Sequence, residues 1–172
     1  YTGGGLHAES QVLRHAAILN EHVFGNPHSA SPASLGMTKL VEQARHAVLD
    51  WFNTSPDDYT AVFTANATGA LKHVGESYPF GTGTQFLLTV DNHNSVNGIR
   101  EFARAKGAPV DYVPVAVPEL RIDVNHLDAL LASPATGPGL FAYPAQSNFS
   151  GVKHPLELVD RAHARGWDVL LD

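Results

Sequence analysis

Cysteine is absent from the 172 residues, and several other features are scarce. Without a thiol, disulfides and thiolate metal sites are excluded within these residues. The same absence favours an intracellular protein, which we expect to be cytoplasmic. Lysine and arginine total 11 and form no cluster, so neither nucleic acid nor an anionic membrane is an expected partner. No apolar run reaches the roughly 20 residues of a membrane span.

The residues that are present suit a globular protein. Hydrophobic residues make up 44% of the chain and charged residues 16%, with a formal net charge of -6. The chain opens on Tyr1 without an initiator methionine and stops directly after the apolar run WDVLL. Because natural domains seldom end on a bare core strand, we expect a piece of a larger protein.

Two kinds of pattern divide the chain. Helical periodicity over 9–24 and 36–52 encloses a Gly/Pro/Ser-rich loop, and we expect residues 1–58 to form an N-terminal helical region. Residues 59–172 alternate strand-like and helical runs. The expected strands are 60–64, 85–90, 110–116, 140–144 and 167–171, and the expected helices are 68–78, 95–106, 124–132 and 155–165. This alternation predicts an α/β fold, a mainly parallel sheet with helices on both faces.

Polar or small residues follow four of the expected strands. They are Ala65–Thr68, Asp91–Ser95, Ala145–Asn148 and Asp172. In parallel sheets, ligands bind beyond the carboxyl ends of the strands. We therefore expect these four stretches to meet at one edge of the sheet and to form a binding site there.

The stretch TANATG, residues 64–69, has the composition of a phosphate cradle. Small side chains let the backbone approach an anion, free N–H groups point outward at a helix start, and Thr68 adds a hydroxyl. An ordinary helix cap by Asn66 or Thr68 explains the same residues, and this stretch alone favours the cap.

His93 and Asp172 add two further hypotheses. An imidazole at a strand end stacks on a flat ring or shuttles a proton, or it is a simple loop histidine. None of the ten histidines has a convincing metal-ligand spacing, so we expect no metal. A carboxylate at the end of a buried strand needs a cationic partner unless the chain turns to solvent. A phosphate, a flat ring and a cationic ring nitrogen together describe pyridoxal phosphate.

Several longer stretches carry a resemblance to a known family. They are FGNPHSASPAS, VFTANATGALKHVGESYPF, DNHNSVNGIREFARAKGA, YPAQSNFSGVKHPLE and GWDVLLD. With these motifs in order, nearly the whole chain resembles the class V aminotransferase group of pyridoxal-phosphate-dependent enzymes. Within that group it is most similar to the aminotransferase-like domain of molybdenum cofactor sulfurases. The resemblance implies part of the large domain of a fold-type I transferase.

The resemblance also assigns roles to individual residues. It implies that the backbone of Ala67 and the backbone and hydroxyl of Thr68 bind the cofactor phosphate. It implies that His93 stacks on the cofactor ring, Asn148 contacts the phenolic oxygen, and Asp172 pairs with the pyridine nitrogen. His93 and Asp172 are thus the expected catalytic residues.

Other parts of the family's site match less of this chain. Asn26 and His28 match a loop near the active-site mouth, on the substrate side. The family's Schiff-base lysine lies beyond the aspartate, and so does the cysteine nucleophile of its desulfurases. We assign the lysine role to none of Lys39, Lys72, Lys106 and Lys153, so these residues alone are expected to be inactive.

The expected function follows from this resemblance. It implies a pyridoxal-phosphate-dependent transferase that is a homodimer and moves sulfur from L-cysteine to the molybdenum cofactor. Another class V activity, such as a lyase, an epimerase or a transaminase, is the alternative enzyme. A catalytically inactive binding module with the same fold is the alternative outside enzymes.

Overall fold

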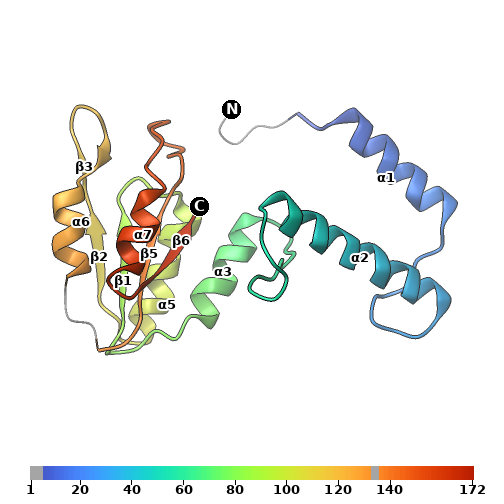
Figure 1. Cartoon of the computed structure of the whole chain (residues 1–172), viewed down its shortest axis with the longest axis horizontal. Coiled ribbons are helices and arrows are strands. Elements are labelled where there is room, and N and C mark those ends of the chain that lie inside the picture. Colours follow the sequence, from blue (N-terminus) through green and yellow to red (C-terminus); the bar gives the residue numbers. More distant parts are fainter. Residues whose placement is uncertain (1–5, 133–135) are drawn as a thin grey trace. The chain divides into compact units, whose positions relative to one another are not determined.

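The chain divides into two compact units. The structure is a computed structural model that describes residues 6–132 and 136–172. Unit 1 is Tyr1–Phe63 and contains two helices, whereas unit 2 is Thr64–Asp172 and contains the sheet (Figure 1). The expected division into a helical region, 1–58, and an α/β cofactor-binding region, 59–172, stays a prediction.

Unit 1 consists of α1 (Glu9–Glu21) and α2 (Pro32–Trp51) with the loop between them. The hydroxyl of Ser31 accepts from the backbone N–H of Ser34, which caps α2, and Pro32 takes the first helical position. The helix therefore begins four residues before the expected start at residue 36. The Ser-Pro pair is a helix-start signal that the Gly/Pro/Ser-rich composition of the loop concealed.

The strand expected over residues 60–64 does not form, so this prediction is wrong. Residues 60–63 have no regular secondary structure and no strand partner within the described residues. The Arg45 side chain donates to the carbonyl of Ala61, and its guanidinium lies 5.3 Å from the centroid of the Phe63 ring. An extended segment counts as a strand only when its backbone pairs with another, and sequence pattern alone does not supply that pairing.

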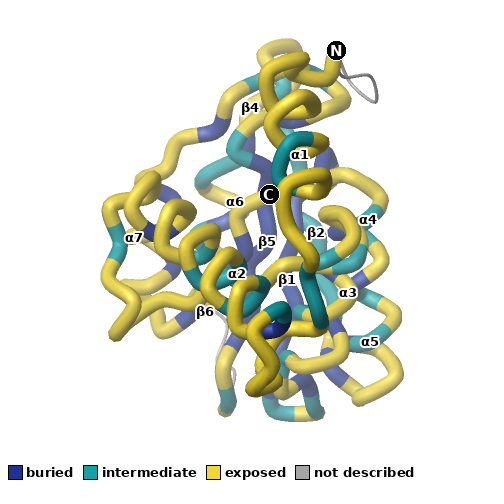
Figure 2. The backbone as a smooth tube through the Cα atoms, turned by 90° about the vertical axis from the view of Figure 1, so that its right-hand side faces the viewer, coloured by how far each residue is buried: buried dark blue, intermediate teal, exposed yellow. Residues whose placement is uncertain are grey.

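Unit 2 is built on a four-stranded, entirely parallel sheet in the order β2-β1-β5-β6. Its strands are β1 (Gln85–Thr89), β2 (Val110–Val113), β5 (Gly139–Tyr143) and β6 (Trp167–Leu171). In register, Phe86 lies opposite Val110 on one side and Leu140 on the other. Every residue of β1 and β5 is buried, as Figure 2 shows in dark blue. The expected mainly parallel sheet is confirmed.

Helices cover both faces of this sheet, as the sequence predicted. They are α3 (Ala67–Ser77), α4 (Asn94–Asn97), α5 (Ile99–Ala105), α6 (Val124–Leu131) and α7 (Glu157–His163). Residues of α3, α4 and α5 pack with Phe86 and Leu88 in one core, and residues of α6 and α7 pack with Leu87 and Phe141 in the other. Alternate residues of β1 thus point to opposite cores.

Two expected elements are divided. The helix predicted over 95–106 is split at Gly98 into α4 and α5. The strand predicted over 110–116 ends at Val113 because Pro114 has no N–H to donate. The next residues form β3 (Val115–Ala116), which pairs antiparallel with β4 (Arg121–Ile122) in a separate ribbon.

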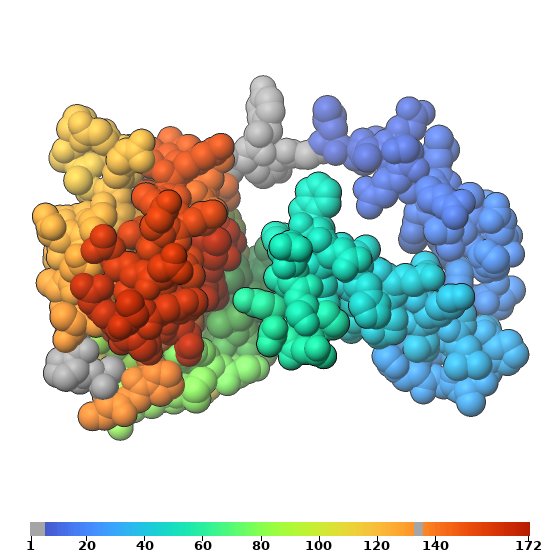
Figure 3. Space-filling model, viewed as in Figure 1, coloured from blue at the N-terminus to red at the C-terminus, as the bar shows by residue number. Residues whose placement is uncertain are grey.

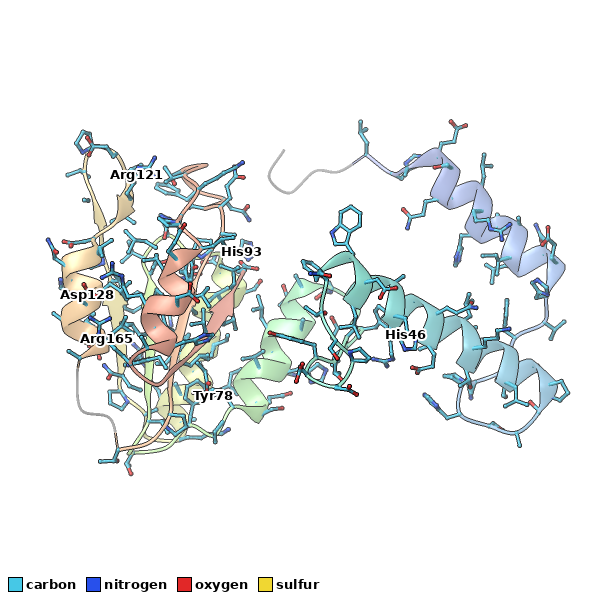
Figure 4. All side chains as sticks on the ribbon, viewed as in Figure 1. His46, Tyr78, His93, Arg121, Asp128 and Arg165 are labelled. Carbon is cyan, nitrogen blue, oxygen red and sulfur yellow. The ribbon has the colours of Figure 1, made fainter. Side chains whose placement is uncertain are left out.

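Close packing fixes the helices that border the candidate site. A Cβ atom at Gly75 of α3 would lie 2.6 Å from the ring of Phe102 on α5, so glycine permits this approach. On the other face, α6 and α7 lie side by side (Figure 3). Asp128 on α6 forms ion pairs with Arg161, at 2.7 Å, and with Arg165, at 3.4 Å (Figure 4).

The order of the strands creates a switch point at the carboxyl ends of β1 and β5. From β1 the chain crosses one face of the sheet through α4 and α5 to reach β2. From β2 it returns over the other face through α6 to β5, which lies on the opposite side of β1. The connections therefore diverge at these two strands, which is where ligands bind in open α/β sheets.

Candidate active site

Three predicted site residues follow three neighbouring strands. His93 comes after β1, Asn148 after β5 and Asp172 directly after β6, and these strands are adjacent in the sheet. Because the strands are parallel, all three residues lie at the same edge. The convergence of strand ends expected from the sequence is therefore present for these three.

His93 caps α4 and has a defined hydrogen-bonding pattern. Its Nδ1 accepts from the backbone N–H of Ser95 at 3.2 Å and lies 2.9 Å from the Ser95 hydroxyl. Because Nδ1 accepts, the proton of the neutral ring resides on Nε2. The ring is exposed and lies at the end of unit 2 opposite Tyr78 (Figure 4).

Thr68 is linked to His93 through Ser95. The Thr68 and Ser95 hydroxyl oxygens are 2.8 Å apart, so the three side chains form one hydrogen-bonded chain. This chain joins the start of α3 to the loop after β1. Thr68 and His93, which the sequence indicated independently, are thus joined through Ser95. Ser95 lay within an expected strand-end stretch but had no assigned role.

The start of α3 is both capped and open to an anion. The Asn66 side chain accepts from the Gly69 N–H at 2.9 Å, which is the ordinary cap that this stretch alone favoured. Within the described residues, the N–H groups of Ala67 and Thr68 have no hydrogen-bond acceptor. Both residues are exposed, so the cap leaves two backbone donors available, and the Thr68 hydroxyl, which is bonded to Ser95, lies beside them.

Asn148 sits at the tip of a tight loop. The Ser147 N–H donates to the Val152 carbonyl at 2.9 Å, and the Gly151 N–H donates to the Ser147 carbonyl at 2.8 Å. Gly151 has a φ of 75°, which this closure requires and which glycine adopts without strain. Asn148 is exposed, and together with His93 it lines a cavity of about 420 Å³.

Asp172 is held by its backbone alone. Its N–H donates to the Tyr143 carbonyl at 3.1 Å, and its carbonyl accepts from the Ala145 N–H at 2.8 Å. The side chain is exposed. Its pairing with a ring nitrogen stays a prediction.

A buried polar layer under these loops was not predicted. Asp91 Oδ2 lies 2.8 Å from His154 Nε2, and the two side chains are 3% and 0% exposed. The Ser147 hydroxyl donates to the Asp91 carbonyl at 3.1 Å. Asp91 and Ser147 stood in the expected strand-end stretches, which was the available signal. His154 lies in the stretch YPAQSNFSGVKHPLE but had no assigned role, and only the fold brings it near Asp91.

The remaining predicted residues lie elsewhere. Asn26 and His28 are exposed residues of unit 1, and the His28 N–H donates to the Thr38 hydroxyl at 2.7 Å. Their expected role on the substrate side stays a prediction. Lys106 donates to the carbonyls of Glu76 and Tyr78 at the end of α3, away from His93.

Residues 6–132 and 136–172 contain neither a metal-binding cluster nor a membrane-spanning helix. No three His, Asp or Glu side chains are grouped to hold a metal ion. No helix of this part of the chain has the length and apolar character needed to cross a membrane.

Residues 7–172 match the family model described as Aminotransferase class-V. The molybdenum cofactor sulfurase of Arabidopsis thaliana is 38% identical, with 92% of this chain and 22% of the relative aligned. The human molybdenum cofactor sulfurase is 37% identical over the whole chain and 21% of its own length. A solved structure of the cysteine desulfurase CsdA from Escherichia coli is 26% identical, with a TM-score of 0.74 over 95% of this chain and 41% of that one.

These likenesses settle the family. This chain spans about a fifth of the length of the curated relatives that it matches. The resemblance inferred from the sequence motifs is confirmed, as is the fold of a type I large domain. At the level of the family, the expected pyridoxal phosphate is confirmed too. The chain belongs to the aminotransferase class-V family of pyridoxal-phosphate-dependent enzymes.

Proposed function

We propose that this chain forms the cofactor-binding part of an enzyme that uses pyridoxal phosphate to take sulfur from L-cysteine and deliver it to the molybdenum cofactor. One observation carries the cofactor assignment. Thr68, His93 and Asn148 meet at the switch point of the sheet, two joined through Ser95 and two lining one cavity. The names of the relatives support the sulfur chemistry.

The start of α3 fits the phosphate. The Ala67 and Thr68 N–H groups lack acceptors within the described residues, and the Thr68 hydroxyl lies beside them. The helix dipole adds partial positive charge at the same point. These donors suit the oxygens of a phosphate monoester and need no lysine or arginine, which fits the absence of a basic cluster.

The three strand-end residues fit the ring. His93 stacks on its face, the Asn148 amide donates to the phenolic oxygen, and the Asp172 carboxylate pairs with the pyridine nitrogen and keeps it protonated. When bound, the cofactor supplies an electron sink for the Cα substituents of an amino acid. Because Nδ1 of His93 accepts from Ser95, Nε2 is the atom through which His93 exchanges a proton with the substrate.

The rest of the proposal concerns the full-length protein. The Schiff-base lysine and the sulfur-accepting cysteine come from residues outside these 172, and none of the four lysines here takes that role. Asn26 and His28 border the substrate. The working enzyme is a cytoplasmic homodimer.

The test is a titration of the full-length protein with pyridoxal phosphate and with pyridoxal, followed by absorbance. Thr68→Val keeps the side-chain shape and removes one hydrogen bond to a charged group, which is worth about 1.5–3 kcal/mol. We expect this loss for pyridoxal phosphate and little loss for pyridoxal. The control is Thr82→Val, at an exposed loop threonine.

Several results would contradict the proposal. Equal losses of affinity for the two ligands would show that the phosphate does not bind at the start of α3. With saturating cofactor, L-cysteine should yield alanine and enzyme-bound sulfur. Production of pyruvate or a racemised amino acid instead would indicate a lyase or an epimerase, and no turnover would indicate an inactive binding module.

A further inference from the structure

The buried pair of Asp91 and His154 takes no part in the function proposed above. Asp91 follows β1, and His154 precedes α7 on the far side of the Asn148 loop. Their side chains are hydrogen-bonded at 2.8 Å and almost fully shielded from water. Burying two titratable groups is costly, and a pair of apolar residues fills such a space without that cost. An arrangement of this kind therefore calls for an explanation beyond packing.

The pair bridges the two loops that carry the ring-contacting residues. Asp91 is two residues before His93. On the other loop, the His154 N–H donates to the Ala145 carbonyl at 3.0 Å, so His154 is fixed to the stretch that leads into Asn148. A displacement of either loop would have to break this buried hydrogen bond.

Ser147 provides a second bridge between the same loops. Its hydroxyl donates to the Asp91 carbonyl at 3.1 Å and accepts from the N–H groups of Phe149 and Ser150, both at 3.3 Å. These two residues follow Asn148 directly. Ser147 is 1% exposed, so its contacts are protected from competition with water.

Asn92 ties the base of the first loop to the sheet. Its Nδ2 donates to the Thr89 carbonyl at 2.9 Å and to the Ala142 carbonyl at 3.0 Å, thereby joining β1 to β5. Its neighbour His93 is exposed, whereas Asp91 and Asn92 are buried. His93, which is proposed to contact the ring, thus lies one residue from buried Asn92 and two from buried Asp91.

We propose that Asp91, His154 and Ser147 form a clamp that positions His93 and Asn148 against the cofactor ring. This inference rests on the proposed function, because it assumes that the ring lies between the two loops. All three are positioning residues that act through His93 and Asn148. Functional side chains need support of this kind, since small displacements of a contact weaken binding severely.

The experiment measures pyridoxal phosphate affinity and the absorption of the bound cofactor in the full-length protein. Ser147→Ala removes one bridge with little change in volume. We expect the dissociation constant to rise roughly 10-fold, by analogy with the partners that orient metal ligands. The absorption band should also shift, because Asn148 contacts the phenolic oxygen of the chromophore. The matched control is Ser77→Ala, at an exposed serine that ends α3.

A double-mutant cycle separates positioning from a general structural effect. If Ser147 acts through Asn148, then Ser147→Ala should weaken binding far less in an Asn148→Ala background than in the native one. His154→Gln gives a second test. Its side-chain amide can still donate to Asp91, so it should bind within about threefold of the native protein, whereas His154→Leu should not.

The outcomes distinguish this inference from the function on which it rests. Additive effects of Ser147→Ala and Asn148→Ala, or an unchanged affinity and band in Ser147→Ala, would overturn the clamp while the native protein still bound the cofactor. Failure of the native protein to bind pyridoxal phosphate at all would overturn the proposed function, and the clamp with it.

Discussion

Each end of the parallel sheet holds a polar side-chain pair, and the two pairs differ in burial. At the carboxyl end, Asp91 and His154 are hydrogen-bonded at 2.8 Å in a dry environment. At the amino end, the Tyr78 hydroxyl donates to Asp168 at 2.9 Å, but Asp168 is exposed to solvent. The lengths of the two hydrogen bonds are nearly equal, so distance does not distinguish them. Their exposure does.

The difference shows where the fold tolerates a costly arrangement. An exposed hydrogen bond exchanges easily with water and contributes little to stability, whereas a buried polar pair becomes expensive as soon as one partner is lost. The Tyr78–Asp168 pair at the amino end is of the exposed, low-cost kind. The buried pair lies under the two loops that carry His93 and Asn148, so the costly arrangement is at the carboxyl end.

The largest expected effect breaks the buried pair. His154→Leu leaves the Asp91 carboxylate buried without its partner, which costs about 3–5 kcal/mol of unfolding free energy. Chemical denaturation of the full-length protein, followed by circular dichroism, measures this loss. His163→Leu, at an exposed histidine in the last turn of α7, is the control and should change stability by less than about 0.5 kcal/mol. Similar losses in the two variants would show that burial does not set the two ends apart.

A second expected effect appears at alkaline pH. Tyr143 ends β5, is fully buried, and donates to the Pro155 carbonyl at 3.2 Å. Burial, aided by the charges of Glu157 and Asp160, raises the pKa of this hydroxyl from 10.0 to about 12. The unfolded chain thus loses its proton at a lower pH than the folded chain. The resulting stabilisation is complete below pH 10 and is lost as the pH rises towards 12.

Tyr143→Phe tests this linkage. Between pH 10 and 12, the native protein should lose about 2–3 kcal/mol more stability than the variant, because phenylalanine has no proton to release. Denaturation curves at several alkaline pH values provide the measurement. Parallel pH profiles for the two proteins would mean that the Tyr143 hydroxyl ionises as easily in the folded state as in the unfolded one.

The sequence predicted most of this end of the sheet but not its base. Strand order follows from pairing between distant residues, yet the alternation of strands and helices was sufficient to place Asp91, His93 and Ser147 beyond strand ends. The pairing of His154 with Asp91 could not be predicted in this way. His154 lies 63 residues from its partner, and the stretch around it gives no sign of that pairing, so only the folded structure brings the two together.

The failure at 60–64 has a physical cause that a local pattern does not show. An apolar run followed by a polar residue reads as a buried strand, but burial and pairing depend on neighbours that a local pattern does not contain. Residues 60–63 have no partner strand within the described residues. By contrast, the cap at Asn66 is a local feature, and the sequence predicted it correctly.

The smallest expected effect concerns the amino end itself. Burial, with a further contribution from the Asp168 carboxylate, raises the pKa of the partly buried Tyr78. Tyr78→Phe removes the hydroxyl but keeps the ring, whose centroid lies 4.7 Å from that of Phe80. Asp168 then returns to water at little cost because it is already exposed. We therefore expect a loss of about 0.5–1.5 kcal/mol, measured by denaturation at pH 7, with unchanged cofactor affinity. A loss as large as that of His154→Leu would contradict the contrast between the two ends, because it would give an exposed hydrogen bond the weight of a buried one.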